Sequence, residues 1–119
     1  MIKIINIEWI DKDNEEAEVT LSDGEHQLVC FAHPFNLKEG ESIKNSIFIL
    51  GYEEIFKSYE NKYQIKYLGN LKQYINGKVI DRKRGLVQVG EFMLGGVYVI
   101  PGDLVDGDYI EFLVYRCDI

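Results

Sequence analysis

The sequence predicts a mostly-β, single-domain small barrel covering residues 1–119, with one short helix near residues 52–62. Its 119 residues with 46% hydrophobic side chains suffice for one buried core. Eleven glycines against two prolines, together with eight tyrosines and six phenylalanines, favour strands over helices. A two-sheet β-sandwich is the alternative architecture for the same set of strands.

The N-terminal third contains three strand signals. Residues 2–10 carry apolar side chains on both faces, which predicts a strand buried on two sides at its start. Residues 16–22 alternate cleanly between apolar and polar, as expected for a strand with one face in water. The turn residues Ser22-Asp23-Gly24 then predict a hairpin into a third strand over residues 26–33.

The middle of the chain departs from this pattern. Apolar residues over 52–63 are spaced by three and four, and Glu53 and Lys57 form an i,i+4 pair, which together predict an amphipathic helix. Asn76-Gly77, between two apolar pairs, is the strongest hairpin signal of the chain.

The remaining strands follow from shorter signals. Residues 42–50 and 109–117 read as strands, and the second is expected to be central because both of its faces are apolar. Turns at Gly69-Asn70 and at residues 82–85 precede strands over 86–89 and 92–100.

Two segments, 34–43 and 101–110, read PFNLKEGESI and PGDLVDGDYI and lie 67 residues apart. Their Pro, Leu, Gly and Ile coincide, and three further positions are chemically close. Common local requirements, with Pro ending a strand and Gly reversing the chain, are favoured over gene duplication as the explanation of this similarity. Either origin predicts two equivalent corners in the fold.

The order of elements resembles that of an OB-type barrel. Three strands, a fourth after Pro34, a helix and then further strands are similar to a fold in which a helix follows the third strand. The resemblance concerns architecture alone, and it implies binding of single-stranded nucleic acid as one possible function.

The net charge and the two cysteines limit the classes of binding partner and the cellular compartment that the sequence predicts. The net charge of −7 and the pI near 4.8 argue against undirected binding to nucleic acid or anionic lipid. The amino terminus has no signal-peptide pattern, and no apolar run is long enough to span a bilayer. With Cys30 and Cys117 expected to be reduced and buried, the sequence predicts a cytoplasmic, bacterial protein without a membrane partner.

Metal and nucleophile signals are weak. His26, Cys30 and His33 crowd one strand, where alternation points the last of them away from the others, and no Cys-x-x-Cys pair exists. No serine lies in a Gly-x-Ser-x-Gly elbow. We therefore expect no metal, no cofactor and no catalytic residue, and a small hydrolase is the least favoured of three functions.

Basic side chains concentrate in residues 62–84, which carry seven cations against Asp81 alone. Interleaved tyrosines make this segment a candidate nucleic-acid or ligand face, because bases stack on aromatic rings between basic groups. The residues assigned to this face are Lys72, Tyr74, Lys78, Arg82, Lys83 and Arg84.

The rest of the chain is strongly acidic, and this favours a different function. An acidic β domain without a catalytic constellation suits a regulatory protein, of the inhibitor or immunity type, that covers a basic partner. The candidate contact residues are Asp11, Asp13, Glu15, Glu16, Asp103, Asp106 and Asp108. Protein binding is thus the leading expectation, and single-stranded nucleic-acid binding through residues 62–84 is the alternative.

Overall fold

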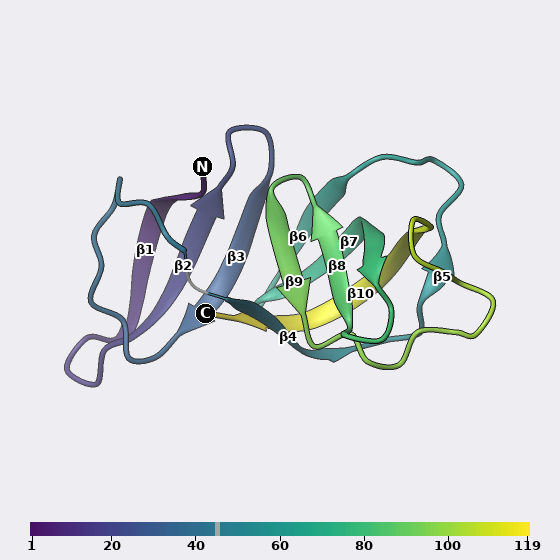
Figure 1. Cartoon of the computed structure of the whole chain (residues 1–119). Coiled ribbons are helices and arrows are strands. Elements are labelled where there is room, and N and C mark those ends of the chain that lie inside the picture. Colours follow the sequence, from purple (N-terminus) through teal and green to yellow (C-terminus); the bar gives the residue numbers. More distant parts are fainter. Residues whose placement is uncertain (45) are drawn as a thin grey trace.

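The computed structural model describes residues 1–44 and 46–119, and this part of the chain folds into strands and loops without a helix. Its ten strands are β1 (Lys3–Asp11), β2 (Glu16–Ser22), β3 (Gln27–Ala32), β4 (Ile47–Tyr52), β5 (Phe56–Lys57), β6 (Gln64–Gly69), β7 (Lys72–Asp81), β8 (Leu86–Val89), β9 (Phe92–Gly95) and β10 (Tyr109–Asp118). Figure 1 shows β1 to β3 at one end of an elongated molecule and β6 to β9 toward the other.

Five of these strands close into a small barrel, as the sequence predicts. The ring runs β4, β10, β7, β8, β9 and back to β4, and its β4–β9 pair is parallel while the others are antiparallel. Strand β10 is central, as expected, because it pairs with β7 along one edge and with β4 and β5 along the other. Fully buried Phe92, Ile110 and Phe112 fill the interior.

The barrel differs from an OB-type barrel in chain order. In an OB-type barrel the two strands that complete the ring follow a three-stranded meander. Here the meander β7–β8–β9 has β4 before it and β10 after it. The order of the ring strands along the chain therefore differs from that of an OB-type barrel.

The predicted helix over residues 52–62 is wrong. The segment instead lies along β10, where Phe56 and Lys57 pair as β5 with Glu111 and Ile110. The N–H groups of Glu53 and Ser58 donate to the carbonyl oxygens of Leu113 (2.9 Å) and Tyr109 (2.8 Å). The free edge of β10 satisfies this backbone, so tertiary pairing outweighs the local helical spacing.

The hairpin predicted at Asn76-Gly77 is also wrong, because both residues lie inside β7. Gly77 serves close packing: a Cβ there would lie 2.8 Å from the Gln88 carbonyl oxygen and 2.8 Å from a Val87 methyl group. The β6–β7 hairpin forms instead where Gly69-Asn70 predicts a turn, with Asn70 and Leu71 in the left-handed region at φ 53° and 67°.

Other strand predictions hold with altered ends. Strand β2 alternates as predicted, but only one face of β1 is well buried, since Ile4 is inaccessible while Ile5 and Ile10 are exposed. The strand expected over 42–50 begins only at Ile47. The strand expected over 92–100 ends at Gly95, because the backbone turns at Gly96 (φ 88°).

The segments 34–43 and 101–110 form corners with the same local hydrogen bonds. The Glu41 N–H donates to the Lys38 carbonyl oxygen (3.2 Å), and the Lys38 N–H donates to Glu41 Oε2 (2.9 Å). Sixty-seven residues later, the Asp108 N–H donates to the Val105 carbonyl oxygen (3.0 Å), and the Val105 N–H donates to Asp108 Oδ2 (2.9 Å).

Each corner also contacts a neighbouring strand in the same way. The Gly40 N–H donates to the Ile4 carbonyl oxygen on β1, and the Gly107 N–H donates to the Val79 carbonyl oxygen on β7, both at 2.7 Å. Both glycines have left-handed φ values, 88° and 94°, which a side chain would disfavour. Ile4 and Val79 are thus equivalent positions.

The equivalence extends through both meanders. In β1–β2–β3 and in β7–β8–β9, the first strand pairs with the second, and the second with the third, at matching buried positions. The matched positions are Ile4, Leu21 and Leu28 in the first meander and Val79, Val87 and Leu94 in the second.

The two halves meet at the β4–β10 pair. Leu50 pairs with Arg116 and Ile49 pairs with Cys117, and these two pairs interchange when every number is moved by 67. Strand β4 also runs parallel to β9 of the second half, and β10 runs parallel to β3 of the first. The molecule therefore has two similar halves that exchange their last strands (Figure 1).

Candidate binding groove

An open groove of about 650 Å³ lies where the first half meets the barrel. One wall comes from the start of β1 and the segment that leads into β4, and the other comes from β8, β9 and the adjacent turns. The lining residues are Ile2, Ile43, Lys44, Ser46, Ile47, Phe48, Arg84, Leu86, Glu91, Met93, Gly95, Gly96 and Tyr98. We call this site the β8–β9 groove.

Large apolar side chains in the β8–β9 groove are unusually accessible. Phe48 is 48% exposed, Met93 is 41% exposed and Tyr98 is 67% exposed. Phe48 lies beside Gly95 in the parallel β4–β9 pair, where the absent side chain leaves its ring uncovered. Grouped exposed apolar residues with a polar rim are typical of protein-interaction sites.

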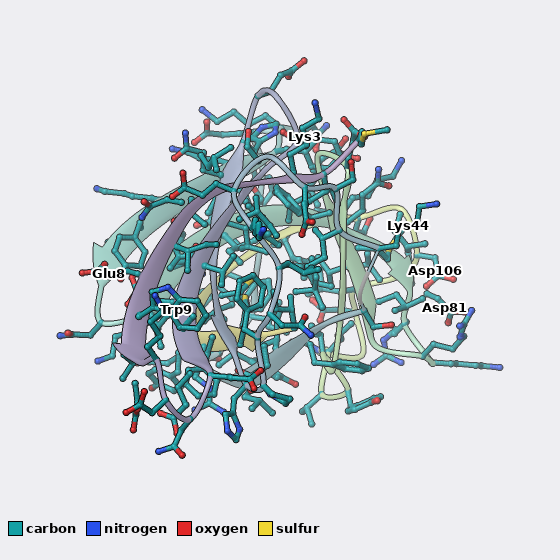
Figure 2. All side chains as sticks on the ribbon, turned by 90° about the vertical axis from the view of Figure 1, so that its left-hand side faces the viewer. Lys3, Glu8, Trp9, Lys44, Asp81 and Asp106 are labelled. Carbon is teal, nitrogen blue, oxygen red and sulfur yellow. The ribbon has the colours of Figure 1, made fainter. Side chains whose placement is uncertain are left out.

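The rim carries two cations and one carboxylate. Lys44 and Arg84 are exposed, and Glu91 accepts a hydrogen bond from the amino group of Met1. Figure 2 shows Lys44 on the side of the molecule away from Glu8 and Trp9 of β1. The groove thus offers apolar contact together with a local excess of positive charge, although the whole chain is acidic.

The first half has a surface equivalent to the β8–β9 groove, and Tyr63 and strand β6 of the same chain face that surface. A cleft of about 620 Å³ is bounded by β2 and β3 on one side and by Tyr63 and β6 on the other. Five of its lining positions lie 66 residues before five positions of the β8–β9 groove. The matched positions are Glu18, Thr20, Glu25, Gln27 and Val29 in the cleft, and Arg84, Leu86, Glu91, Met93 and Gly95 in the groove.

The predicted nucleic-acid face is only partly assembled. Lys72, Tyr74 and Lys78 share one face of β7, as alternation requires. The Lys72 ammonium lies over the Tyr115 ring (5.7 Å) and the Lys78 ammonium over the Tyr109 ring (6.0 Å). These tyrosines of β10 therefore hold cations of the chain itself.

The centre of that face carries negative charge. The Tyr74 hydroxyl donates to Glu111 (3.2 Å), and burial followed by the charge of Glu111 raises the pKa of Tyr74. Glu111 also accepts a hydrogen bond from Asn76 (3.3 Å). A carboxylate between the two lysines disfavours a phosphate backbone.

The three basic residues of the β7–β8 turn do not join this face. The Arg82 guanidinium donates to the Ile100 carbonyl oxygen (2.6 Å), so it holds the long loop before β10. Lys83 lines a separate shallow site with Val105, whereas Arg84 lines the β8–β9 groove.

The acidic candidates form two clusters, at opposite ends of the molecule (Figure 1). Asp11, Asp13, Glu15 and Glu16 belong to the β1–β2 turn and its flanks, and Asp103, Asp106 and Asp108 belong to the loop before β10. Several carboxylates have local roles: Asp11 accepts from Asn14, Asp106 from the Arg82 N–H and Asp108 from the Val105 N–H.

A partly buried Asp–His pair joins the two halves. Asp23 accepts hydrogen bonds from the N–H groups of Glu25, His26 and Glu91, and its second oxygen lies 3.4 Å from the His26 ring nitrogen. Burial opposes ionisation, but these hydrogen bonds lower the pKa of Asp23 to about 2. Asp23 thus fixes the β2–β3 turn to the β8–β9 turn.

Both cysteines are buried free thiols. Burial, followed by contact with Cys117, raises the pKa of Cys30. A thiol held protonated in this way is a poor nucleophile. Within residues 1–44 and 46–119, no group of three His, Cys, Asp or Glu side chains is placed to hold a metal ion.

Sequence reasoning missed the β8–β9 groove. Residues 47–50 read Ile-Phe-Ile-Leu, a run that predicts burial on both faces, yet Phe48 and Leu50 are exposed. Nothing in the local pattern of β8 or β9 marks Leu86 or Met93 as accessible. The similarity of residues 34–43 and 101–110 indicates two equivalent halves. It does not indicate that their surfaces differ.

Comparison of the chain with protein-family models, with curated proteins and with solved structures finds no match. Across the described residues, no helix is long and apolar enough to cross a membrane.

Proposed function

We propose that this protein is a protein-binding, regulatory module whose contact surface is the β8–β9 groove. The observation that carries the proposal is the gathering of exposed Phe48, Met93 and Tyr98 around an open hollow of about 650 Å³. Burial of such side chains by a partner removes apolar surface from water and drives association. Lys44 and Arg84 at the rim add orientation and specificity.

The expectation of a basic partner stays a prediction, supported by the net charge of −7. The separation of the two acidic clusters makes one contact with both of them less favourable for a small partner. The local positive charge at the β8–β9 groove supports a partner that brings acidic groups to that surface.

Affinity capture from the native host tests the proposal with matched variants. We expect the wild type to retain a partner that Met93→Asp loses, because a charge at the exposed Met93 position of the otherwise buried strand β9 opposes burial of the groove. Leu68→Asp on β6 is the control, since Leu68 (50% exposed) is at least as accessible as Met93 (41%) but lies outside the groove.

Both variants must keep the wild-type thermal transition. Loss of the partner from Met93→Asp with retention by Leu68→Asp supports the groove. A capture profile that is the same for the wild type and both variants contradicts the proposed function.

A further inference from the structure

We infer that Cys30 and Cys117 form a reversible disulfide, which locks β10 to β3, when the protein meets a small-molecule disulfide such as oxidised glutathione. The inference goes beyond the proposed function and does not depend on the β8–β9 groove. It follows from the place that the fold gives to the two cysteines of the chain, which are far apart in the sequence.

Backbone pairing places the two cysteines opposite each other on neighbouring strands. Asp118 of β10 pairs in parallel with Phe31 of β3, and the Ile119 N–H donates to the Phe31 carbonyl oxygen (3.1 Å). One residue earlier on each strand are Cys117 and Cys30, which therefore lie side by side. Neighbouring strands run about 4.8 Å apart, a separation that falls within the Cα–Cα range of about 4.4–6.8 Å that disulfides span.

The two side chains point into the same part of the core. Both cysteines are fully buried in one hydrophobic cluster, and their thiol groups are in contact. The Gln73 side-chain amide, which also hydrogen-bonds to β3, lies 3.9 Å from Cys117 Sγ. The pair is therefore located where β3 meets the barrel, and a bond between the sulfur atoms can form with the strand pairing unchanged.

Thiol–disulfide exchange supplies the chemistry in two balanced steps. The thiolate of one cysteine attacks a sulfur atom of oxidised glutathione, which breaks the glutathione S–S bond and releases one glutathione thiolate. The second cysteine thiolate then attacks the protein sulfur atom of the mixed disulfide, which forms the Cys30–Cys117 bond and releases the second glutathione. The protein thiols lose two electrons and two protons, and the two glutathione molecules take them up as thiols. An excess of reduced glutathione reverses both steps.

Burial determines when this exchange starts. Both thiols are inaccessible in the closed fold, and burial raises the pKa of the Cys30 thiol, which keeps it protonated. Because the thiolate is the attacking form, exchange requires local opening of the contact between β3 and β10. The register of β10 with β3 covers Asp118 and Phe31, whereas its register with β7 runs from Tyr109 to Val114. The contact with β3 is thus the shorter attachment of β10.

Equilibration of the full-length protein with mixtures of reduced and oxidised glutathione tests this inference. After acid quenching, free thiols are alkylated under denaturing conditions, and the intact mass distinguishes free thiols, glutathione adducts and an internal disulfide. We expect the oxidised native protein to carry neither alkyl groups nor glutathione, and dithiothreitol to restore two alkylation sites. Persistent glutathione adducts, or two free thiols at every glutathione ratio, would overturn the inference.

The oxidised protein should also be more stable to heat. A bond between distant positions restricts the unfolded chain, so we expect the thermal transition to rise by about 5 °C or more on oxidation. A transition that is unchanged or lowered by the internal disulfide would contradict a lock that fits the native fold.

The same glutathione titration in concentrated urea shows whether the fold brings the two thiols together. We expect the equilibrium constant for disulfide formation to be at least tenfold higher in the native protein than in the unfolded chain. Equal constants, or a higher constant in urea, would overturn the placement of the pair by the fold.

Cys30→Ala and Cys117→Ala are the matched controls, because each leaves one thiol that can bind glutathione but cannot close the internal bond. Each variant should keep one alkylation site or gain one glutathione, and its thermal transition should not rise in oxidised glutathione. A rise of the same size in either variant would show that oxidation stabilises the protein without the Cys30–Cys117 bond, and would overturn the inference.

Discussion

The side-chain amide of Gln73 on β7 forms two hydrogen bonds with the backbone of Val29 on β3, at the seam between the two halves. The Val29 N–H donates to Gln73 Oε1 (2.8 Å), and Gln73 Nε2 donates to the Val29 carbonyl oxygen (2.9 Å). Gln73 is fully buried, and its amide takes the place of a neighbouring strand at a point where β3 has no other partner on that edge. This side chain closes the sheet between β3 and the barrel.

Replacing Gln73 with Leu should destabilise the fold by about 2–4 kcal/mol, because it leaves the N–H and carbonyl groups of Val29 buried without partners. Urea denaturation measures the change in the free energy of unfolding. Gln64→Leu on exposed β6 is the control and should change stability by less than about 0.5 kcal/mol. A loss below about 1 kcal/mol for Gln73→Leu would show that the amide does not close the seam.

Gly77→Ala should destabilise by about 1–3 kcal/mol, because the new Cβ would collide with the β8 backbone and with Val87. The matched control is Gly102→Ala, since a Cβ there meets no atom within 4 Å. Thermal unfolding compares the two variants directly. Equal transition temperatures would contradict the close packing of Gly77 against β8.

The Asp23 carboxylate should contribute stability that disappears in acid. Its folded pKa of about 2 lies below that of an unfolded aspartate, about 3.9, so the contribution is complete above about pH 4 and falls as the pH drops toward 2. The expected size is about 2 kcal/mol. The free energies of unfolding of wild type and Asp23→Asn should therefore converge as the pH falls across this range.

Asp13→Asn serves as the control for that experiment, because Asp13 is exposed in the β1–β2 turn. The free energy of unfolding of this variant should differ from that of wild type by a constant amount over the whole pH range. A constant difference between wild type and Asp23→Asn from pH 6 to pH 2 would contradict the assigned pKa.

The protein should not bind single-stranded oligonucleotides at physiological salt. Lys72 and Lys78 lie over tyrosine rings, Glu111 separates them, and Arg82 holds a loop carbonyl group. Fluorescence anisotropy with a labelled oligonucleotide measures this. Micromolar, salt-sensitive affinity that Lys72→Glu abolishes would favour the nucleic-acid function instead, since each phosphate contact contributes about 0.7 to the salt slope.

The β-strand architecture was predictable because local alternation records which face of a strand is buried. Residues 16–22 and the central strand near the C-terminus show this directly. The helix prediction failed because the spacing of apolar residues over 52–63 cannot show that the edge of β10 is free to pair. Asn76-Gly77 misled for a related reason, since packing against β8 also requires a glycine.

The candidate groove was not predictable in the same way. Phe48, Leu86 and Met93 come from three strands. Leu86 is half-buried, and the exposure of Phe48 and Met93 depends on how the two halves meet. The charge pattern shows that basic residues gather in residues 62–84. It could not show that Arg82, Lys83 and Arg84 have three different environments.

Site-specific photo-crosslinking in the native host shows whether a partner protein contacts the β8–β9 groove. A benzophenone amino acid replaces either Phe48 in the β8–β9 groove or Phe56 on β5, two phenylalanines of similar exposure, 48% and 53%. We expect a discrete crosslinked partner protein from position 48 and none from position 56. The same adduct from both positions, or an adduct from position 56 alone, would contradict it.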